Sequence, residues 1–224
     1  MVSRSPRIVI FDNDGTLVPS HEVVNPAIQA AFTLFCGTRG IDAPAPTDAR
    51  LRELTGSTGE VFFRSLLPDE WKHLHAELRA TCLDHEVAAM LAKGHFYPGI
   101  EEMLVSLRQL GRRLAVATHA GERYIEAVGA RLGYDRLFDR VYCHGRDGMS
   151  SKSEMARRVI EELGPGEAVF VGDRRDDAAA AAEVGIRFVG CLYGYGGAGE
   201  LAGADALVSS PTDLAGFLQD GAPL

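Results

Sequence analysis

Short apolar segments alternate with helical patterns along most of the chain. Residues 8–11, 114–117 and 168–171 are unbroken apolar segments that contain β-branched side chains. Such segments are typical of strands that are buried on both faces of a parallel sheet. Weaker strand patterns cover residues 138–143, 186–192 and 206–208. Apolar stripes at helical spacing separate these strands, so we predict an α/β fold with a Rossmann-like, mostly parallel sheet flanked by helices.

The first two strong strand patterns are separated by a long segment with a different character. Residues 18–96 show helical periodicity and no buried-strand pattern, whereas connections in α/β units usually run about 2–6 residues. We therefore predict an inserted, small α-helical cap domain at 18–96. The α/β core domain would comprise residues 1–17 and 97–224.

Capping residues suggest how the insert is divided into helices. Asn25 followed by Pro26 predicts the start of a first helix, because these residues suit the N-cap and the first helical position. Thr47 and Thr58 would cap two shorter helices, and a long fourth helix is predicted at 69–93. The insert therefore reads as a small helical bundle.

Composition narrows the function classes. The 224 residues carry a formal net charge of −8 and are 46% hydrophobic, which argues against a protein that binds the nucleic-acid backbone. The four cysteines are far apart and form no CxxC pair, so reduced thiols and a cytoplasmic location are expected. No stretch is long enough to span a bilayer. We expect no membrane and no nucleic-acid polymer as partner, and the oligomeric state is left open.

Chemically competent side chains stand at the ends of the predicted strands. Asp12 and Asp14 follow the first strand, Thr118 follows the second, and Asp173 follows the strand at 168–171. Lys152 opens the helix that follows the third strand. Because ligands of parallel α/β sheets bind at the carboxyl ends of the strands, these side chains are expected to converge.

The types of these residues point to a metal and a phosphate. Asp12 and Asp14 are one residue apart, so in an extended chain both would leave the same face and repel each other unless a cation or proton lies between them. Carboxylate oxygens suit Mg²⁺, which often also binds a phosphate oxygen. Each feature alone also fits an ordinary turn or helix start, but their joint placement favours a site.

At this point the chain resembles a known family. The motifs Asp12-x-Asp14-Gly15-Thr16, Thr118, Lys152 and Gly172-Asp173-x-x-x-Asp177 are similar to the four motifs of the haloacid dehalogenase-like hydrolases, in their phosphatase branch. The helical insert resembles the cap of the subfamily that includes phosphoglycolate phosphatases. The segments Phe96-Tyr97-Pro98-Gly99-Ile100 and Gly194-Tyr195-Gly196 are also similar to that group.

The resemblance implies a Mg²⁺-dependent phosphomonoesterase that hydrolyses a small phosphate ester, such as a phosphoglycolate-like compound or a sugar or nucleotide phosphate, through an aspartyl phosphate. By resemblance Asp12 is the nucleophile, Asp14 the general acid and base, and Thr118 and Lys152 hold the phosphate. The implied metal ligands are Asp12, Asp173 and the backbone carbonyl of Asp14. Asp177 would orient the metal shell.

Five further residues are candidates for contact with the substrate. Gly15 and Thr16 complete the first motif, and His119 follows Thr118. Thr55 and Gly56 lie in a cap loop whose glycines allow close approach and whose hydroxyls can meet a polar substrate.

Some residues depart from the family pattern. His119 stands where many relatives have asparagine or a small residue, and Arg174-Arg175 stands where serine or threonine is frequent. The segment before Lys152 lacks the more usual Gly-Lys-Pro. The roles of His119 and Arg174 are left open.

Other functions share some of these sequence features. A receiver-like phospho-acceptor module also gathers Asp, Thr and Lys around Mg²⁺, but the insert, the chain length and Asp14 speak against it. A haloacid dehalogenase needs no Mg²⁺ and would not normally keep an acid at position 14. The segment 194–199 has the G-x-G-x-x-G spacing of a dinucleotide site, but it leads into a poor helix and the next strand ends without an acidic residue.

Overall fold

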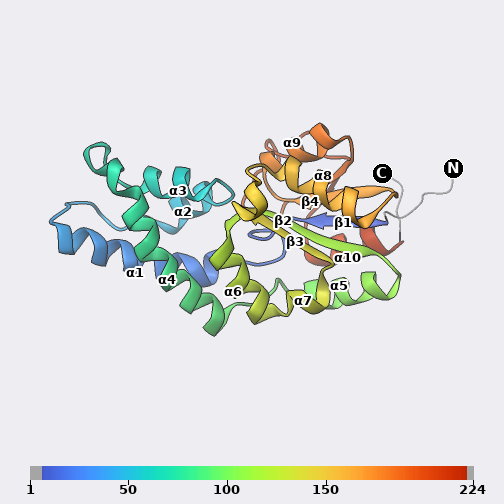
Figure 1. Cartoon of the computed structure of the whole chain (residues 1–224), viewed down its shortest axis with the longest axis horizontal. Coiled ribbons are helices and arrows are strands. Elements are labelled where there is room, and N and C mark those ends of the chain that lie inside the picture. The colour runs from blue at the N-terminus through green and yellow to red at the C-terminus, as the bar shows by residue number, and fades with distance from the viewer. Residues whose placement is uncertain (1–6, 221–224) are drawn as a thin grey trace.

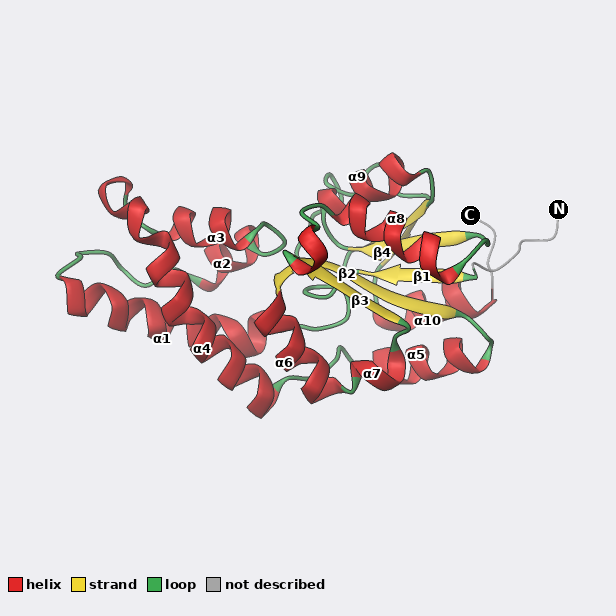
Figure 2. Ribbon diagram, viewed as in Figure 1, coloured by secondary structure: helices red, strands yellow, loops and turns green. Residues whose placement is uncertain are grey.

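The computed structural model describes residues 7–220, in which a parallel sheet forms the centre of the core. Strand β1 (Ile8–Phe11) lies in the middle of the six-stranded order β3-β2-β1-β4-β5-β6. The other strands are β2 (Arg113–Gly121), β3 (Arg140–His144), β4 (Ala168–Gly172), β5 (Arg187–Cys191) and β6 (Ala206–Val208). Every neighbouring pair is parallel. The predicted α/β fold is confirmed (Figure 2).

Helices cover both faces of the sheet (Figure 1). Alternation along β1 decides which side chain meets which layer, since Val9 and Phe11 join one apolar cluster and Ile8 and Ile10 join the other. The first cluster packs on α5 (Ile100–Gln109), α6 (Glu122–Leu132), α7 (Tyr134–Leu137) and α10 (Pro211–Asp220). The second packs on α8 (Lys152–Leu163) and α9 (Arg175–Val184). A short 3₁₀ turn, Arg146–Gly148, precedes α8.

The segment between β1 and α5 is helical and projects from one end of the sheet (Figure 1). It contains α1 (Ser20–Arg39), α2 (Asp48–Leu54), α3 (Gly59–Leu66), a 3₁₀ segment (Asp69–Leu74) and α4 (His75–Lys93). Helix α4 packs along α1 and also along α6 of the core. We propose residues 18–96 as a cap domain. Its two connections meet, because the amide of Tyr97 donates to the Leu17 carbonyl at 2.9 Å.

The first helix begins earlier than the sequence pattern indicates. Helix α1 starts at Ser20 and has Pro26 inside it, so the predicted cap at Asn25 is wrong. Pro26 lies within the second turn, where one missing amide is tolerated because the apolar face of α1 is buried against the rest of the insert. The Asn25 side chain instead donates to Asp48 at 2.5 Å.

Of the two predicted threonine caps, one makes its hydrogen bond. Thr47 caps α2 by accepting from the Arg50 amide at 3.2 Å, whereas Thr58 precedes α3 without a capping hydrogen bond from its side chain. Ser151 with Glu154 forms a capping box at the start of α8. The predicted helix at 69–93 is divided, since its first six residues are a 3₁₀ segment. Among the described residues the four cysteines are free and buried. None of the helices described combines the length and apolar character that crossing a bilayer would need.

Candidate active site

The sheet order brings three acidic side chains together. Asp12 follows β1 and Asp173 follows β4, and these two strands are neighbours in the sheet. Asp177 lies in the first turn of α9, directly after the β4 loop. One carboxylate oxygen from each of the three lies within 4.8 Å of the others, and all three residues are buried. The predicted convergence at the strand ends is therefore present in the geometry.

Lys152 lies between two of these carboxylates. Its Nζ is 2.9 Å from Asp12 and 2.6 Å from Asp177, and the side chain is almost fully buried. Burial lowers the pKa of Lys152, but the two carboxylates outweigh burial and raise the pKa above its usual value. Lys152 therefore stays charged and fixes the orientation of Asp12.

The cluster is suited to a divalent cation. Three carboxylates face a single ammonium group, so full ionisation would leave two negative charges unbalanced in a buried place. Burial, followed by repulsion from Asp12 and Asp177, raises the pKa of Asp173. A hard cation with oxygen preference, such as Mg²⁺, fits both the donor atoms and the missing charge.

Asp173 is held by contacts from distant parts of the chain. The Thr16 hydroxyl donates to its Oδ1 at 3.1 Å, and the Tyr195 amide donates to its Oδ2 at 2.6 Å. Glycine is needed in the loop that follows β5, because a Cβ at Gly194 or Gly196 would collide with Asp173. Close packing on Asp173 thus explains the first two glycines of the G-x-G-x-x-G spacing at 194–199, and the following residues form turns and no helix.

Asp14 lines a cavity that Asp12 also lines. The Tyr124 hydroxyl donates to its Oδ1 at 2.9 Å. Burial and the nearby charge of Asp12 raise the pKa of Asp14. Asp14 is therefore a carboxyl group that holds a proton more readily than an ordinary aspartate.

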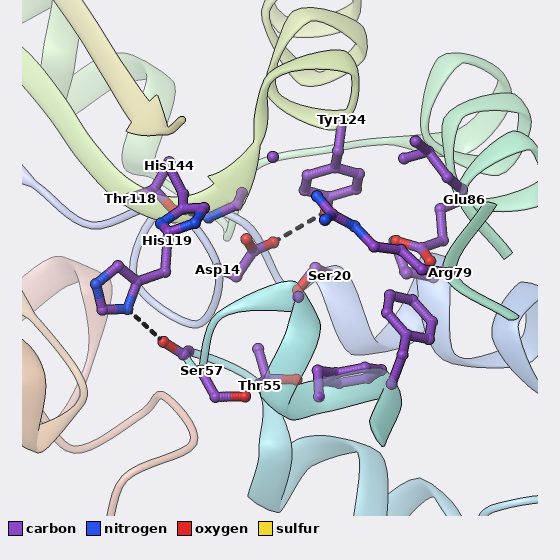
Figure 3. Close-up of a pocket in the computed structure, with 18 of the residues that line it drawn as sticks. Asp14, Ser20, Thr55, Ser57, Arg79, Glu86, Thr118, His119, Tyr124 and His144 are labelled. Carbon is purple, nitrogen blue, oxygen red and sulfur yellow. Dashed lines mark hydrogen bonds between the residues drawn. The ribbon is translucent and has the colours of Figure 1, made fainter. Parts of the chain in front are cut away.

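The cavity has a volume of about 400 Å³ and lies between the strand ends and the inserted helices. Figure 3 shows Asp14, Thr118, His119 and Tyr124 from the core, and Ser20, Thr55, Ser57, Arg79 and Glu86 from the insert, around this space. Asp12 and Asp14 both line it. A reactant held at the carboxylates would therefore have its remaining part against the insert.

Two core residues donate hydrogen bonds to the end of α2 and to the loop that follows it. His119 Nδ1 lies 2.8 Å from the Gly56 carbonyl, and because a carbonyl only accepts, this nitrogen carries the proton. The Arg174 guanidinium donates to the Glu53 carbonyl at 3.1 Å. These residues are two of the departures from the family pattern. Arg174 contacts the last turn of α2, and His119 contacts the loop that follows it.

The remaining predicted residues are placed as follows. Thr118 lies in β2, which continues to Gly121 with a register shift against β3; its hydroxyl accepts from the Ala120 amide at 3.2 Å. Thr55 and Gly56 line the cavity, although the Thr55 hydroxyl donates to Leu51. Gly15 and Thr16 lie beside Asp173. Contact with the substrate stays a prediction for Gly15, Thr16, Thr55, Gly56 and His119.

Several residues at the site were not found from the sequence. Tyr124 binds Asp14, Tyr195 binds Asp173 through its amide, and Arg79 and Glu86 line the cavity from α4. The only sequence signal for the α4 pair is their seven-residue spacing, which places both on one helix face. That spacing cannot tell which face points to the site.

The site was compared with known proteins. The family model for haloacid dehalogenase-like hydrolases matches residues 6–185. A phosphoglycolate phosphatase of Pseudomonas savastanoi pv. phaseolicola is 30% identical over 200 residues, which cover 85% of this chain and 71% of that protein. A 5'-nucleotidase of Pseudomonas aeruginosa is 29% identical over 203 residues and is covered to 86%, as is this chain.

Solved structures show the same similarity. CbbY from Rhodobacter sphaeroides, determined in complex with phosphate, superposes with a TM-score of 0.72 at 26% identity. The match covers 92% of this chain and 94% of that protein. Core and insert are therefore both shared with a protein whose structure contains phosphate.

Proposed function

This chain belongs to the haloacid dehalogenase-like hydrolases, and we propose that it is a Mg²⁺-dependent phosphomonoesterase for a small phosphorylated metabolite. The observation that carries the proposal is the pair Asp12 and Asp14 on one cavity. Asp12 is oriented by Lys152 and Asp14 has a raised pKa. A nucleophile and a proton donor are thus available at the same place.

Its relatives support the substrate class. Proteins named phosphoglycolate phosphatase and 5'-nucleotidase both act on phosphate monoesters, and each is similar over most of this chain. The chain is accordingly an enzyme that hydrolyses phosphate monoesters.

In the first step, a carboxylate oxygen of Asp12 attacks phosphorus and the ester oxygen leaves with the proton of Asp14. Lys152, already next to Asp12, would stabilise the charge on the phosphoryl oxygens together with the Thr118 hydroxyl. The raised pKa of Asp14 keeps the required proton available. The product of this step is an aspartyl phosphate on Asp12 and a free alcohol.

In the second step, a water molecule attacks the phosphorus of the aspartyl phosphate. Asp14, now ionised, accepts the proton of that water, and Asp12 is released as a carboxylate with inorganic phosphate. Tyr124 donates to Asp14 and would keep its carboxylate oriented during both steps. The same residue thus works first as acid and then as base.

We propose Mg²⁺ as the cofactor, with Asp12, Asp173 and the Asp14 carbonyl as ligands and Asp177 orienting the shell. The excess of carboxyl groups over the single ammonium group in the cluster supports this proposal. When bound, the ion would supply positive charge for the phosphoryl oxygens.

We further propose that the cap selects the organic part of the substrate. Thr55, Gly56 and Ser57 line the cavity opposite the acids, and Gly56 has a positive φ of 98° that glycine adopts without strain. A cavity closed by such a loop favours small esters over macromolecules. The acidic net charge and the free cysteines support a cytoplasmic enzyme without a nucleic-acid polymer as partner.

The alternatives carry less support. A receiver-like module has no need of a cavity of about 400 Å³ over its phospho-acceptor. A dehalogenase has no need of the acid at Asp14, and the relatives named above are phosphatases.

Phosphate release from a panel of esters, with Mg²⁺ and with EDTA, tests the proposal. We expect phosphate release in Mg²⁺ and not in EDTA. The rate of release should fall by several orders of magnitude in Asp12→Asn, because an amide is a poor nucleophile. Asp42→Asn, at an exposed acid of the insert, is the matched control and should keep full activity. Release that is equally fast in EDTA, or by Asp12→Asn, would contradict the proposal.

A further inference from the structure

The part of the cavity that faces the insert has an apolar wall. Val24 and Ile28 contribute from α1, Phe62 and Phe63 from α3, and Leu83 from α4. The two phenyl rings are in contact, with centroids 5.0 Å apart. Phosphate chemistry at Asp12 does not use this wall, so it must face the part of the substrate that leaves.

Two polar side chains interrupt this wall, and one of them has a buried atom without a hydrogen-bond partner. Arg79 and Glu86 project from the same face of α4 into the cavity, as Figure 3 shows. The Arg79 side chain is exposed to solvent and its charge acts on Glu86, whereas the buried Oε1 of Glu86 has no hydrogen-bond partner among the described residues. A buried polar atom without a partner is costly, which indicates that a ligand supplies the partner.

The two groups offer different hydrogen bonds. Arg79 is a planar group with donors only. Burial, and then the charge of Asp14, raise the pKa of Glu86 to about 8, so its carboxyl keeps a proton at neutral pH. Glu86 therefore both donates and accepts. A ligand edge that carries donors and acceptors side by side would satisfy this pair.

The size of the cavity also restricts the ligand. Its volume of about 400 Å³ lies within the range of roughly 300–1,000 Å³ that is usual for sites of drug-sized ligands. A two-carbon leaving group such as glycolate would leave the aromatic wall and the polar pair without contact. A flat ring with hydrogen-bonding groups on its edge would contact both.

We propose that Phe62, Arg79 and Glu86 form a subsite for a heteroaromatic leaving group, so that the substrate is a phosphate ester of about nucleoside size. This inference rests on the proposed phosphatase function and specifies its substrate class. Two sources share the required chemistry, the nucleoside 5'-monophosphates and phosphorylated heteroaromatic vitamers. The experiment separates them.

The first measurement compares kcat/KM in Mg²⁺ for three groups of esters: the common nucleoside 5'-monophosphates, pyridoxal 5'-phosphate, and the small esters phosphoglycolate and glycerol 3-phosphate. We expect at least one heteroaromatic ester to exceed both small esters by about tenfold or more, the effect of one stacked ring. A preference for nucleotides or for pyridoxal phosphate identifies the source. Equal or higher kcat/KM for the small esters overturns the inference and leaves the phosphatase function intact.

Substitutions test the three residues. Phe62→Leu, Arg79→Gln and Glu86→Leu should each lower the ratio of kcat/KM for the best heteroaromatic ester to that for glycerol 3-phosphate by about tenfold. Glu86→Gln should retain most of the ratio, because an amide also donates and accepts. The matched controls Val61→Ala and Arg64→Gln change exposed neighbours on α3 that do not line the cavity, and should change nothing. An unchanged ratio in all three subsite variants would refute the subsite.

Binding of the free product keeps the test independent of turnover. We expect calorimetry to detect the preferred nucleoside or pyridoxal with the wild-type protein and to show weaker binding with Glu86→Leu. If no ester is hydrolysed but a product binds in this way, the proposed function fails and the subsite stands. If no product binds and no ester is preferred, the subsite fails.

Discussion

At the scale of single residues, Asp12 and Asp14 show how two identical side chains acquire different properties. Asp12 contacts the Lys152 ammonium at 2.9 Å. Asp14 is not paired with a cation, and burial together with Asp12 raises its pKa. Their surroundings therefore differ in the way that the proposed roles of nucleophile and acid require.

Asp14→Asn should slow the reaction according to the leaving group. An alkyl phosphate needs the Asp14 proton, so we expect kcat to fall by about 10²–10⁴-fold, with a smaller loss in the first step for p-nitrophenyl phosphate. For wild type, kcat/KM for alkyl esters should fall as pH rises through the raised pKa of Asp14, because the acid form is then lost. Stopped-flow and steady-state rates across the leaving-group series provide the measurement. Equal losses for all leaving groups would remove Asp14 from this role.

The sequence predicted the residues whose positions follow from strand order, and missed those whose positions depend on side-chain packing. Asp12 and Asp173 directly follow β1 and β4, and Thr118 lies in the last part of β2, so their convergence follows from a parallel sheet. Arg79 and Glu86 are on a helix whose orientation toward the core is set by packing of α4 against α1 and α6. No local sequence pattern specifies how α4 is oriented toward the core.

At the scale of elements, two hydrogen bonds connect the end of α2 and the loop that follows it to the core. His119 holds the Gly56 carbonyl and Arg174 holds the Glu53 carbonyl. Both donors directly follow site residues, Thr118 and Asp173. The position of the cap loop is thereby linked to the strand ends that carry the chemistry.

Removing both hydrogen bonds should favour a state in which this loop is detached from the core. For the double variant His119→Ala, Arg174→Met we expect the equilibrium to shift by about tenfold, since each hydrogen bond contributes about 0.5–1.5 kcal/mol. Hydrogen exchange of the amides at 53–59 should accelerate and KM should rise, while the dependence on Mg²⁺ is kept. Arg175→Met, at the exposed neighbour of Arg174, is the control. Unchanged exchange at 53–59 would show that these contacts do not hold the loop.

The start of α1 shows why element boundaries are harder to predict than elements. Pro26 is a good first residue of a helix, and the sequence alone gives no reason to extend the helix before it. The extension to Ser20 depends on tertiary contacts: Tyr195 lies within hydrogen-bonding distance of Ser20 and accepts from the His21 amide. These contacts come from a loop more than 170 positions away.

At the scale of the whole molecule, the buried acids link stability to pH and to metal. Burial raises the pKa of Asp173 and of Asp177 in the metal-free protein. Between the usual aspartate value and these raised values the folded protein binds more protons than the unfolded chain. The free energy of unfolding contributed by these groups therefore decreases as pH rises through this range.

Mg²⁺ should reverse this loss. A cation takes the place of the protons, so we expect the increase in Tm caused by Mg²⁺ to be small near pH 5 and larger near pH 8. Thermal unfolding in Mg²⁺ and in EDTA at both pH values measures it, with Asp173→Asn as the variant that should lose the difference. An equal increase at both pH values would separate metal binding from the titration of these acids.

The central claim, that Asp12 carries the phosphoryl group, is tested most directly by trapping the intermediate. Asp14→Asn should accumulate the aspartyl phosphate, because the water that hydrolyses it has lost its base. The variant is mixed with acetyl phosphate and Mg²⁺, quenched in acid, digested and analysed by mass spectrometry. The account predicts a single phosphorylated peptide, modified at Asp12, that is absent when EDTA replaces Mg²⁺. Phosphorylation at any other residue, or none while phosphate is still released, would contradict it.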